Sequence, residues 1–147
     1  MLSYRDHART RNNLAFCQLI LGHYDEALSN ADRALALKYD PLFELNKGIA
    51  QSLRGDQSLA TESLRHALEC LRDPRNDHSP EAVYTLLLEV SAHKGSFVEE
   101  LPVDAAILIN LWLLREIKED QLWEELNKSY SDSCLKWAPL IEARRQN

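Results

Sequence analysis

The first half of the chain repeats itself at a spacing of 33 residues. Eight identities recur over the 29 positions 13–41, where roughly two would arise by chance at a usage of about 5–7% per residue type. The matched pairs are Asn13 and Asn46, Gln18 and Gln51, Gly22 and Gly55, Ala27 and Ala60, Ala34 and Ala67, Leu35 and Leu68, Asp40 and Asp73, and Pro41 and Pro74. A period of about 20–50 residues is typical of stacked supersecondary units and not of one closed core.

Each period predicts two amphipathic helices around a glycine. In the first period one apolar stripe runs up to Gly22, and a second stripe, which contains Ala27 and Ala34, follows it. The second period repeats this arrangement around Gly55. Glycine tolerates the left-handed conformation that ends a helix, and small residues let two helices pack closely. We therefore expect a helix hairpin in each period.

This pattern resembles the tetratricopeptide repeat (TPR), whose units of about 34 residues follow W-x2-L-G-x2-Y, then A-x3-F, then P. The residues that carry the resemblance are Leu14, Ala15, Gly22, Tyr24, Ala27, Ala34, Gly48, Gly55, Ala60, Leu64 and Ala67. Five positions depart from it: Arg11 and Glu44 replace Trp, Gln18 and Gln51 replace the first Tyr, and Ala31 replaces the large residue of the second helix. Ankyrin repeats have a similar period, but two helices of equal length around one Gly fit the TPR better.

The resemblance implies an all-α fold, a TPR-like α-solenoid of helix hairpins with extra C-terminal capping helices. We expect one helical domain over 1–147, in four parts: unit 1 at 8–41, unit 2 at 42–74, a degenerate unit 3 at 80–118 and a C-terminal cap at 119–147. The signals for unit 3 are a Ser79-Pro80 start, a helix through Val83, Leu86, Leu87 and Val90, a turn at Gly95-Ser96-Phe97, and a Ser96/Glu99 capping box.

The C-terminal third has the most apolar segments, which predict helices over 103–117, around Leu122 to Tyr130, and around Trp137 to Ile141. A helix that is apolar on all sides is normally buried in protein. Repeat arrays need a cap over their terminal unit. These helices therefore either cap the array and complete its core, or expose a surface for oligomerisation or for a partner.

Composition excludes several partners. The net charge of −6 argues against nucleic acid, which needs a basic surface. The apolar stretch 105–114 is too short to cross a bilayer, which requires about 20 residues. Three cysteines at wide spacing match no metal or redox motif, and Cys17 and Cys70 are interpreted as small core residues. We therefore expect an intracellular, reducing, cytoplasmic setting.

Catalytic motifs are not found in the sequence. It contains no G-x-S-x-G, P-loop, H-E-x-x-H or dinucleotide fingerprint. His66 and Cys70 are four residues apart and share one helix face, but two ligands do not make a zinc site. We expect no enzyme activity, no cofactor and no metal.

In the family, the first helix of each unit lines a concave groove that holds a peptide or a partner helix. The positions that map to this groove are Arg9, Asn12, Asn13, Phe16, Ile20, Leu42, Leu45, Asn46, Ile49 and Leu53. Asn13 and Asn46 occupy one slot a period apart, where an amide either grips the backbone of a ligand or pins loops of the scaffold itself. A largely apolar groove favours an amphipathic helix or a hydrophobic peptide.

The resemblance implies a non-catalytic scaffold that binds a protein or peptide partner in this groove. The alternative is an assembly module that forms a homo-oligomer, or docks into a larger complex, through the apolar helix 103–117. An enzyme hidden in the C-terminal part is a third possibility, which would need polar residues converging near Trp112 or Trp123.

Overall fold

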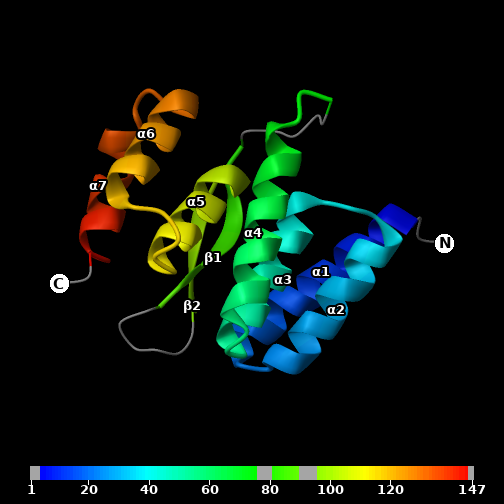
Figure 1. Cartoon of the computed structure of the whole chain (residues 1–147). Coiled ribbons are helices and arrows are strands. Elements are labelled where there is room, and N and C mark those ends of the chain that lie inside the picture. Colours follow the sequence, from blue (N-terminus) through cyan, green and yellow to red (C-terminus); the bar gives the residue numbers. More distant parts are fainter. Residues whose placement is uncertain (1–3, 76–80, 90–95, 146–147) are drawn as a thin grey trace.

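The computed structural model describes residues 4–75, 81–89 and 96–145 (Figure 1). These residues form a mostly helical protein with one small antiparallel sheet. The elements are α1 (Tyr4–Leu21), α2 (Tyr24–Leu37), α3 (Pro41–Leu53), α4 (Gln57–Arg72), β1 (Val83–Leu88), β2 (Ser96–Leu101), α5 (Val103–Leu113), α6 (Glu119–Ser129) and α7 (Ser133–Glu142).

The first four helices form two hairpins that follow the sequence period. The starts of α2 and α4 are 33 residues apart, at Tyr24 and Gln57. Gly22 and Gly55 close the first helix of each hairpin with φ of 85° and 94°. The residue after each glycine donates its N–H to the carbonyl five residues earlier, at 2.8 and 2.9 Å. This bond closes a helix around a left-handed residue, and it gives both hairpins the same turn.

A side-chain bond between the two helices also repeats. Asn30 Nδ2 donates to Gln18 Oε1 at 2.9 Å in the first hairpin. Ser63 Oγ donates to Gln51 Oε1 at 2.7 Å in the second. The two glutamines that replace the family's tyrosine thus tie the paired helices together through polar bonds.

The region predicted as a third helix hairpin is a β-hairpin. β1 and β2 pair antiparallel with Leu86 opposite Val98, so the helix predicted through Val83, Leu86 and Leu87 is wrong. The predicted turn and capping box are wrong as well, because Ser96 and Glu99 lie within β2. Val90, Gly95 and the Ser79-Pro80 start signal lie outside the described residues.

The sheet lies beside α5, which itself also contacts α4 and α3 of the second helix hairpin (Figure 1). β1 contacts α3 and α5, and β2 contacts α1. Leu86 and Leu87 point to opposite faces of the sheet and are both fully buried. A strand buried on both faces needs a continuous apolar run, which explains why its sequence lacks the alternation of a half-exposed strand.

The free edge of β1 is sealed by a side chain of α5. Asn110 Oδ1 accepts from the Leu88 N–H at 2.9 Å, and Asn110 Nδ2 donates to the Leu86 carbonyl at 2.9 Å. The side-chain amide therefore pairs with β1 as another strand's peptide group would. This contact explains why a fully buried asparagine interrupts the most apolar segment of the chain.

The three C-terminal helices form where the apolar segments predict them. Leu122 and Leu126 of α6 and Ile141 of α7 are fully buried and belong to the same core as α3, α4, α5 and β1. Arg72 of α4 pairs with Glu125 of α6 across the surface of this core. The C-terminal helices therefore extend the core of the helix hairpins and do not form a separate body.

Candidate functional site

The residues predicted to line a groove are distributed between the core and the surface. Four of them are buried, namely Asn12, Leu45, Asn46 and Ile49; Phe16, Leu42 and Leu53 are half-buried; Arg9, Asn13 and Ile20 are exposed. The expectation that the four buried residues face a partner does not hold for this structure. Three of the ten remain fully on the surface, and they all lie on α1.

The chain itself fills the inner side of α3. Leu45 and Ile49 belong to the same core cluster as Leu86 and Leu87 of β1 and Ile107 of α5. Because β1 and α5 occupy the space that would be an open groove, these two apolar side chains act as core residues.

The two asparagines of the repeated slot have different surroundings. Asn46 is 1% exposed and donates through Nδ2 to Asn12 Oδ1 at 2.8 Å, which links α3 to α1. Asn13 is exposed on α1. Asn46 therefore pins the scaffold, whereas the Asn13 side chain lies at the surface.

One face of α1 is exposed and partly apolar; we call it the α1 face. It consists of Thr10, Asn13, Leu14, Cys17, Ile20 and Leu21, which recur at helical spacing and are all exposed. Leu14, Ile20 and Leu21 are 45%, 52% and 68% exposed. Cys17, interpreted from the sequence as a core residue, is at the surface. The α1 face is therefore a continuous candidate surface for contact with another helix.

The 33-residue shift places three of the six residues of the α1 face on residues of α3 that are covered. Thr10, Asn13 and Cys17 correspond to Phe43, Asn46 and Ala50, which are 6%, 1% and 0% exposed. They are covered because the first hairpin packs on α3, and Phe43 itself contacts Ala8 and Ala34. These three positions are thus buried in the second hairpin, whereas their counterparts in the first are exposed.

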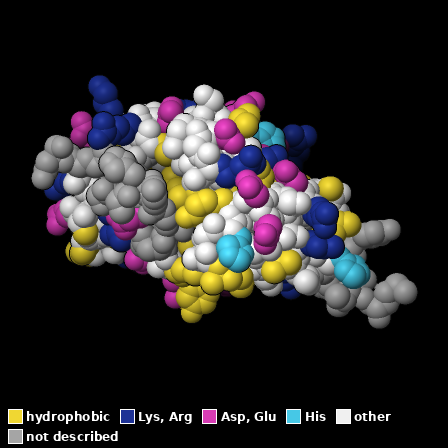
Figure 2. Space-filling model, turned by 90° about the horizontal axis from the view of Figure 1, so that it is seen from below, with side chains coloured by type: hydrophobic (Ala, Val, Ile, Leu, Met, Phe, Trp, Pro, Cys, Tyr) yellow, Lys and Arg dark blue, Asp and Glu magenta, His cyan; other side chains and the backbone are white. Residues whose placement is uncertain are grey.

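Hydrophobic side chains also gather where the two hairpins turn. The α1–α2 and α3–α4 turns lie at the lower end of the molecule in Figure 1. Figure 2, which views the molecule from below, shows an apolar patch in the middle of this end, among charged side chains. The exposed apolar residues next to these turns include Ile20 and Leu21 of the α1 face and Leu59 of α4.

A polar cluster joins α3, α4 and the segment before α3; we call it the thiol cluster, made of Tyr39, Glu44, His66 and Cys70. Glu44 Oε1 accepts from the Tyr39 hydroxyl at 2.6 Å and is 2.6 Å from His66 Nδ1. His66 Nε2 lies 3.8 Å from Cys70 Sγ. Burial, followed by hydrogen bonds with Cys70 and Glu44, raises the pKa of Tyr39 above its ordinary value. Tyr39 is therefore a protonated donor at neutral pH.

The shared face of His66 and Cys70 was visible in the sequence from their spacing, but Glu44 and Tyr39 were not predicted as their neighbours. Cys70 is half-buried, so its interpretation as a core residue is wrong in part. No group of three or more His, Cys, Asp or Glu residues suited to holding a metal occurs within 4–75, 81–89 and 96–145.

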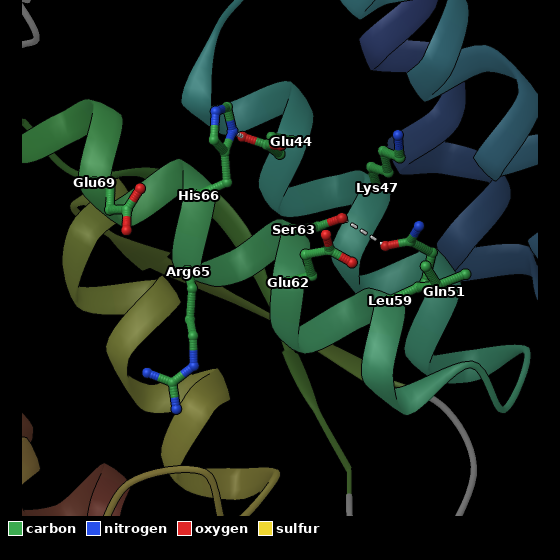
Figure 3. Close-up of a pocket in the computed structure, with 9 residues that line it drawn as sticks. All are labelled: Glu44, Lys47, Gln51, Leu59, Glu62, Ser63, Arg65, His66 and Glu69. Atoms are coloured by element: carbon green, nitrogen blue, oxygen red, sulfur yellow. Dashed lines mark hydrogen bonds and ion pairs between the residues drawn. The ribbon is translucent and has the colours of Figure 1, made fainter.

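A cavity of about 600 Å³ opens beside this cluster between α3 and α4 (Figure 3). Its wall carries both signs of charge, and its lining residues are Glu44, Lys47, Gln51, Leu59, Glu62, Ser63, Arg65, His66 and Glu69. Figure 3 shows the His66–Glu44 contact at one end of the cavity and the Ser63–Gln51 bond within it. The cavity therefore offers charged groups next to the imidazole.

A second cavity of about 600 Å³ lies at the C-terminal end of α5 and includes Trp112, Arg115, Lys118 and Arg144. Arg145 binds Glu119 there through two hydrogen bonds of 2.8 Å. These bonds hold the pKa of Glu119 below its ordinary value. This ion pair links the C-terminal end to the start of α6.

The helix predicted over 103–117 is present as α5, and its apolar surface is covered. Ala105 to Leu111 and Leu113 are at most 5% exposed. An assembly surface made from this helix has no exposed apolar face in this structure. Among the described residues, no helix is both long enough and apolar enough to span a membrane.

Comparison with known proteins gives one partial similarity. A rat (Rattus norvegicus) protein described as "FK506-binding protein-like" is 36% identical over 78 residues, which are 52% of this chain and 22% of that protein. No family model matches the chain, and no solved structure matches it. The chain therefore matches less than a quarter of this relative's length.

Proposed function

We propose that this protein is a non-catalytic protein-interaction module of TPR-like repeats, which binds an amphipathic helix of a partner protein on the α1 face. The observation that carries the proposal is the difference between equivalent positions of α1 and α3. Ala50 of α3 is fully buried, whereas Cys17, one period earlier on α1, is exposed.

The repeat geometry supports the choice of a helix as occupant. On α3 the equivalent face is covered by a helix hairpin, which brings small residues such as Ala8 and Ala34 against Phe43. A surface that repeats this position is shaped to receive a helix that presents small apolar residues at i, i+3, i+4 and i+7. Leu14 and Ile20 supply apolar contact, and the Asn13 amide supplies a donor and an acceptor.

The assignment to TPR-like units is part of this proposal. It is supported by the repeated glycine turns and by the Asn30–Gln18 and Ser63–Gln51 bonds at equivalent positions. A cytoplasmic, reducing setting also belongs to the proposal, since Cys17, Cys70 and Cys134 are all outside disulfides. The name of the rat relative describes that protein alone, and nothing about FK506 is carried over to this chain.

The test uses a defined helical probe. α2 covers part of the equivalent face on α3, so the probe is a fluorescent, helix-constrained peptide with the sequence of Tyr24–Leu37. Fluorescence polarisation measures its binding to the full chain. We expect saturable binding that Cys17→Asp weakens by about tenfold or more, because the substitution places a charge under the bound helix.

The matched control is Cys134→Asp, which makes the same change at an exposed cysteine on α7. This variant should bind the peptide as the unsubstituted chain does. The proposal fails if the peptide shows no saturable binding, or if the two aspartate variants lose affinity equally.

A further inference from the structure

The thiol cluster has the geometry of an activated nucleophile, on a different part of the molecule from the α1 face. Such sites place a nucleophile, a base and a group that orients the base in one hydrogen-bonded line. Here Cys70 Sγ, the His66 ring and the Glu44 carboxylate lie in this order, at 3.8 and 2.6 Å. The histidine thus faces the thiol with one nitrogen and the carboxylate with the other.

Glu44 fixes which nitrogen of His66 carries the proton. A carboxylate accepts hydrogen bonds, so the short contact to Nδ1 places the proton on that nitrogen. Nε2 then presents its lone pair towards Cys70 Sγ. The Glu44 side chain is only 12% exposed, whereas the His66 side chain is 55% exposed, so the imidazole stays accessible from solvent while its carboxylate partner is held in place.

Tyr39 completes the surroundings of the sulfur. Its hydroxyl lies within hydrogen-bonding reach of both Glu44 and Cys70. Its ring also packs edge-on against the His66 ring, with centroids 5.8 Å apart. The hydroxyl donates its one proton to Glu44, and the ring contact limits rotation of the imidazole.

We propose that Cys70 is a reactive thiol that forms a mixed disulfide with a small, zwitterionic disulfide held in the adjacent cavity. Glu44 and His66 belong to the wall of the cavity of about 600 Å³, and Cys70 lies directly behind this wall, 3.8 Å from His66 Nε2. On the same wall Lys47 pairs with Asp32 and Arg65 with Glu116, and both cations keep further N–H donors for a carboxylate, while Glu62 and Glu69 can attract an ammonium group. A peptide-like disulfide such as glutathione disulfide carries both kinds of charge.

The exchange needs no other reagent. His66 Nε2 takes the proton of the Cys70 thiol, and the thiolate attacks one sulfur of the disulfide. The new bond joins Cys70 to that sulfur, the old sulfur–sulfur bond breaks, and the departing thiolate takes the proton from His66. One half of the small disulfide is reduced to a thiol while Cys70 is oxidised to the mixed disulfide.

The chain contains its own controls, since Cys17 and Cys134 are exposed and Cys70 is half-buried. Within the described residues, neither control cysteine is hydrogen-bonded to a histidine. Accessibility alone would therefore make Cys70 the slowest of the three to react. Activation by His66 predicts the opposite order.

The experiment treats the reduced full chain with glutathione disulfide and follows each cysteine by peptide mass spectrometry. We expect the adduct at Cys70 to form about tenfold faster than at Cys17 or Cys134. His66→Gln should bring the Cys70 rate down to or below that of the other two while their own rates stay unchanged. The proposal is overturned if Cys70 reacts more slowly than both controls, or if His66→Gln leaves its rate unaltered.

A second probe tests the cavity. Bis(2-hydroxyethyl) disulfide carries no charge, so the preference for Cys70 over the control cysteines should be smaller with it than with glutathione disulfide. An equal preference with the two probes would overturn the part of the proposal that assigns recognition to the charged wall.

Discussion

Replacing Asn110 by alanine tests the idea that one side chain completes the sheet. Asn110 is fully buried and makes two 2.9 Å bonds to β1, one with the Leu88 N–H and one with the Leu86 carbonyl. Asn110→Ala leaves both backbone groups buried without these partners. Each unsatisfied buried group costs about 1–3 kcal/mol, so we expect a loss of roughly 2–6 kcal/mol in the free energy of unfolding.

The loss is large beside the total stability of a domain, which is about 5–15 kcal/mol. Urea unfolding followed by tryptophan fluorescence measures it, and hydrogen exchange at the Leu88 amide reports the site directly. Asn110→Asp should cost at least as much, because it keeps an acceptor for Leu88 but loses the donor to Leu86 and buries a charge.

The control is Asn13→Ala, which removes an exposed asparagine from another helix and should change stability by no more than about 0.5 kcal/mol. If Asn110→Ala costs less than about 1 kcal/mol and the exchange of the Leu88 amide is unchanged, the side-chain amide does not act as the partner of β1 and the reasoning fails.

Two further predictions concern the stability of the fold: one compares a buried with an exposed isoleucine, and the other tests the Glu119–Arg145 ion pair. Ile49→Ala should lower the free energy of unfolding by about 2–5 kcal/mol, because Ile49 is fully buried. Ile20→Ala should lower it by less than about 0.5 kcal/mol, because Ile20 is 52% exposed. Equal losses of the two variants in urea unfolding would contradict the conclusion that the chain fills the groove. Because hydrogen bonds from Arg145 lower the pKa of Glu119, the ionised carboxylate stabilises the fold above the ordinary pKa of about 4.3, and this contribution is lost as pH falls through the lowered pKa. Thermal melting of Glu119→Gln should therefore depend less on pH in the acid range, and parallel curves for the two proteins would refute the assignment.

The helix hairpins were predictable because their signals are local and repeated. Gly22 and Gly55 mark turns through a backbone conformation that few other residues adopt, so the turns are visible in the sequence. The repeated alanines mark close helix contacts, and Ala27, Ala34 and Ala60 are all fully buried. Two such signals in each period are enough to place α1 to α4.

The β-hairpin was not predictable by the same reasoning. The run from Val83 to Leu88 is apolar and short, and its residues fit a buried helix face or a strand equally well by spacing. Its length and its Val, Tyr and Thr residues favour a strand, whereas the apparent third repeat favours a helix. The prediction of an open groove failed for the same reason. A third helix hairpin would stack beside α4 and leave the inner side of α3 open, whereas β1 packs against α3 and covers it.

The thiol cluster shows what spacing can and cannot reveal. The four-residue separation of His66 and Cys70 indicates one helix face. The position of Glu44 on the neighbouring helix depends on how α3 packs against α4, which no single-helix pattern contains. Glu44 occupies the slot where the family usually has Trp, so a departure from the family pattern was the sequence signal at this site.

The β-hairpin also determines at which end of the repeat array a further helix hairpin can be added. α5 contacts α4 on the side where another hairpin would stack, and the sheet occupies the adjoining space. A tandem duplication of the 33-residue unit after α4 would have to displace both of them. The same duplication placed ahead of α1 would add a hairpin against exposed residues and disturb no described contact. In this fold, a further repeat unit can therefore be added by evolution or engineering only next to α1.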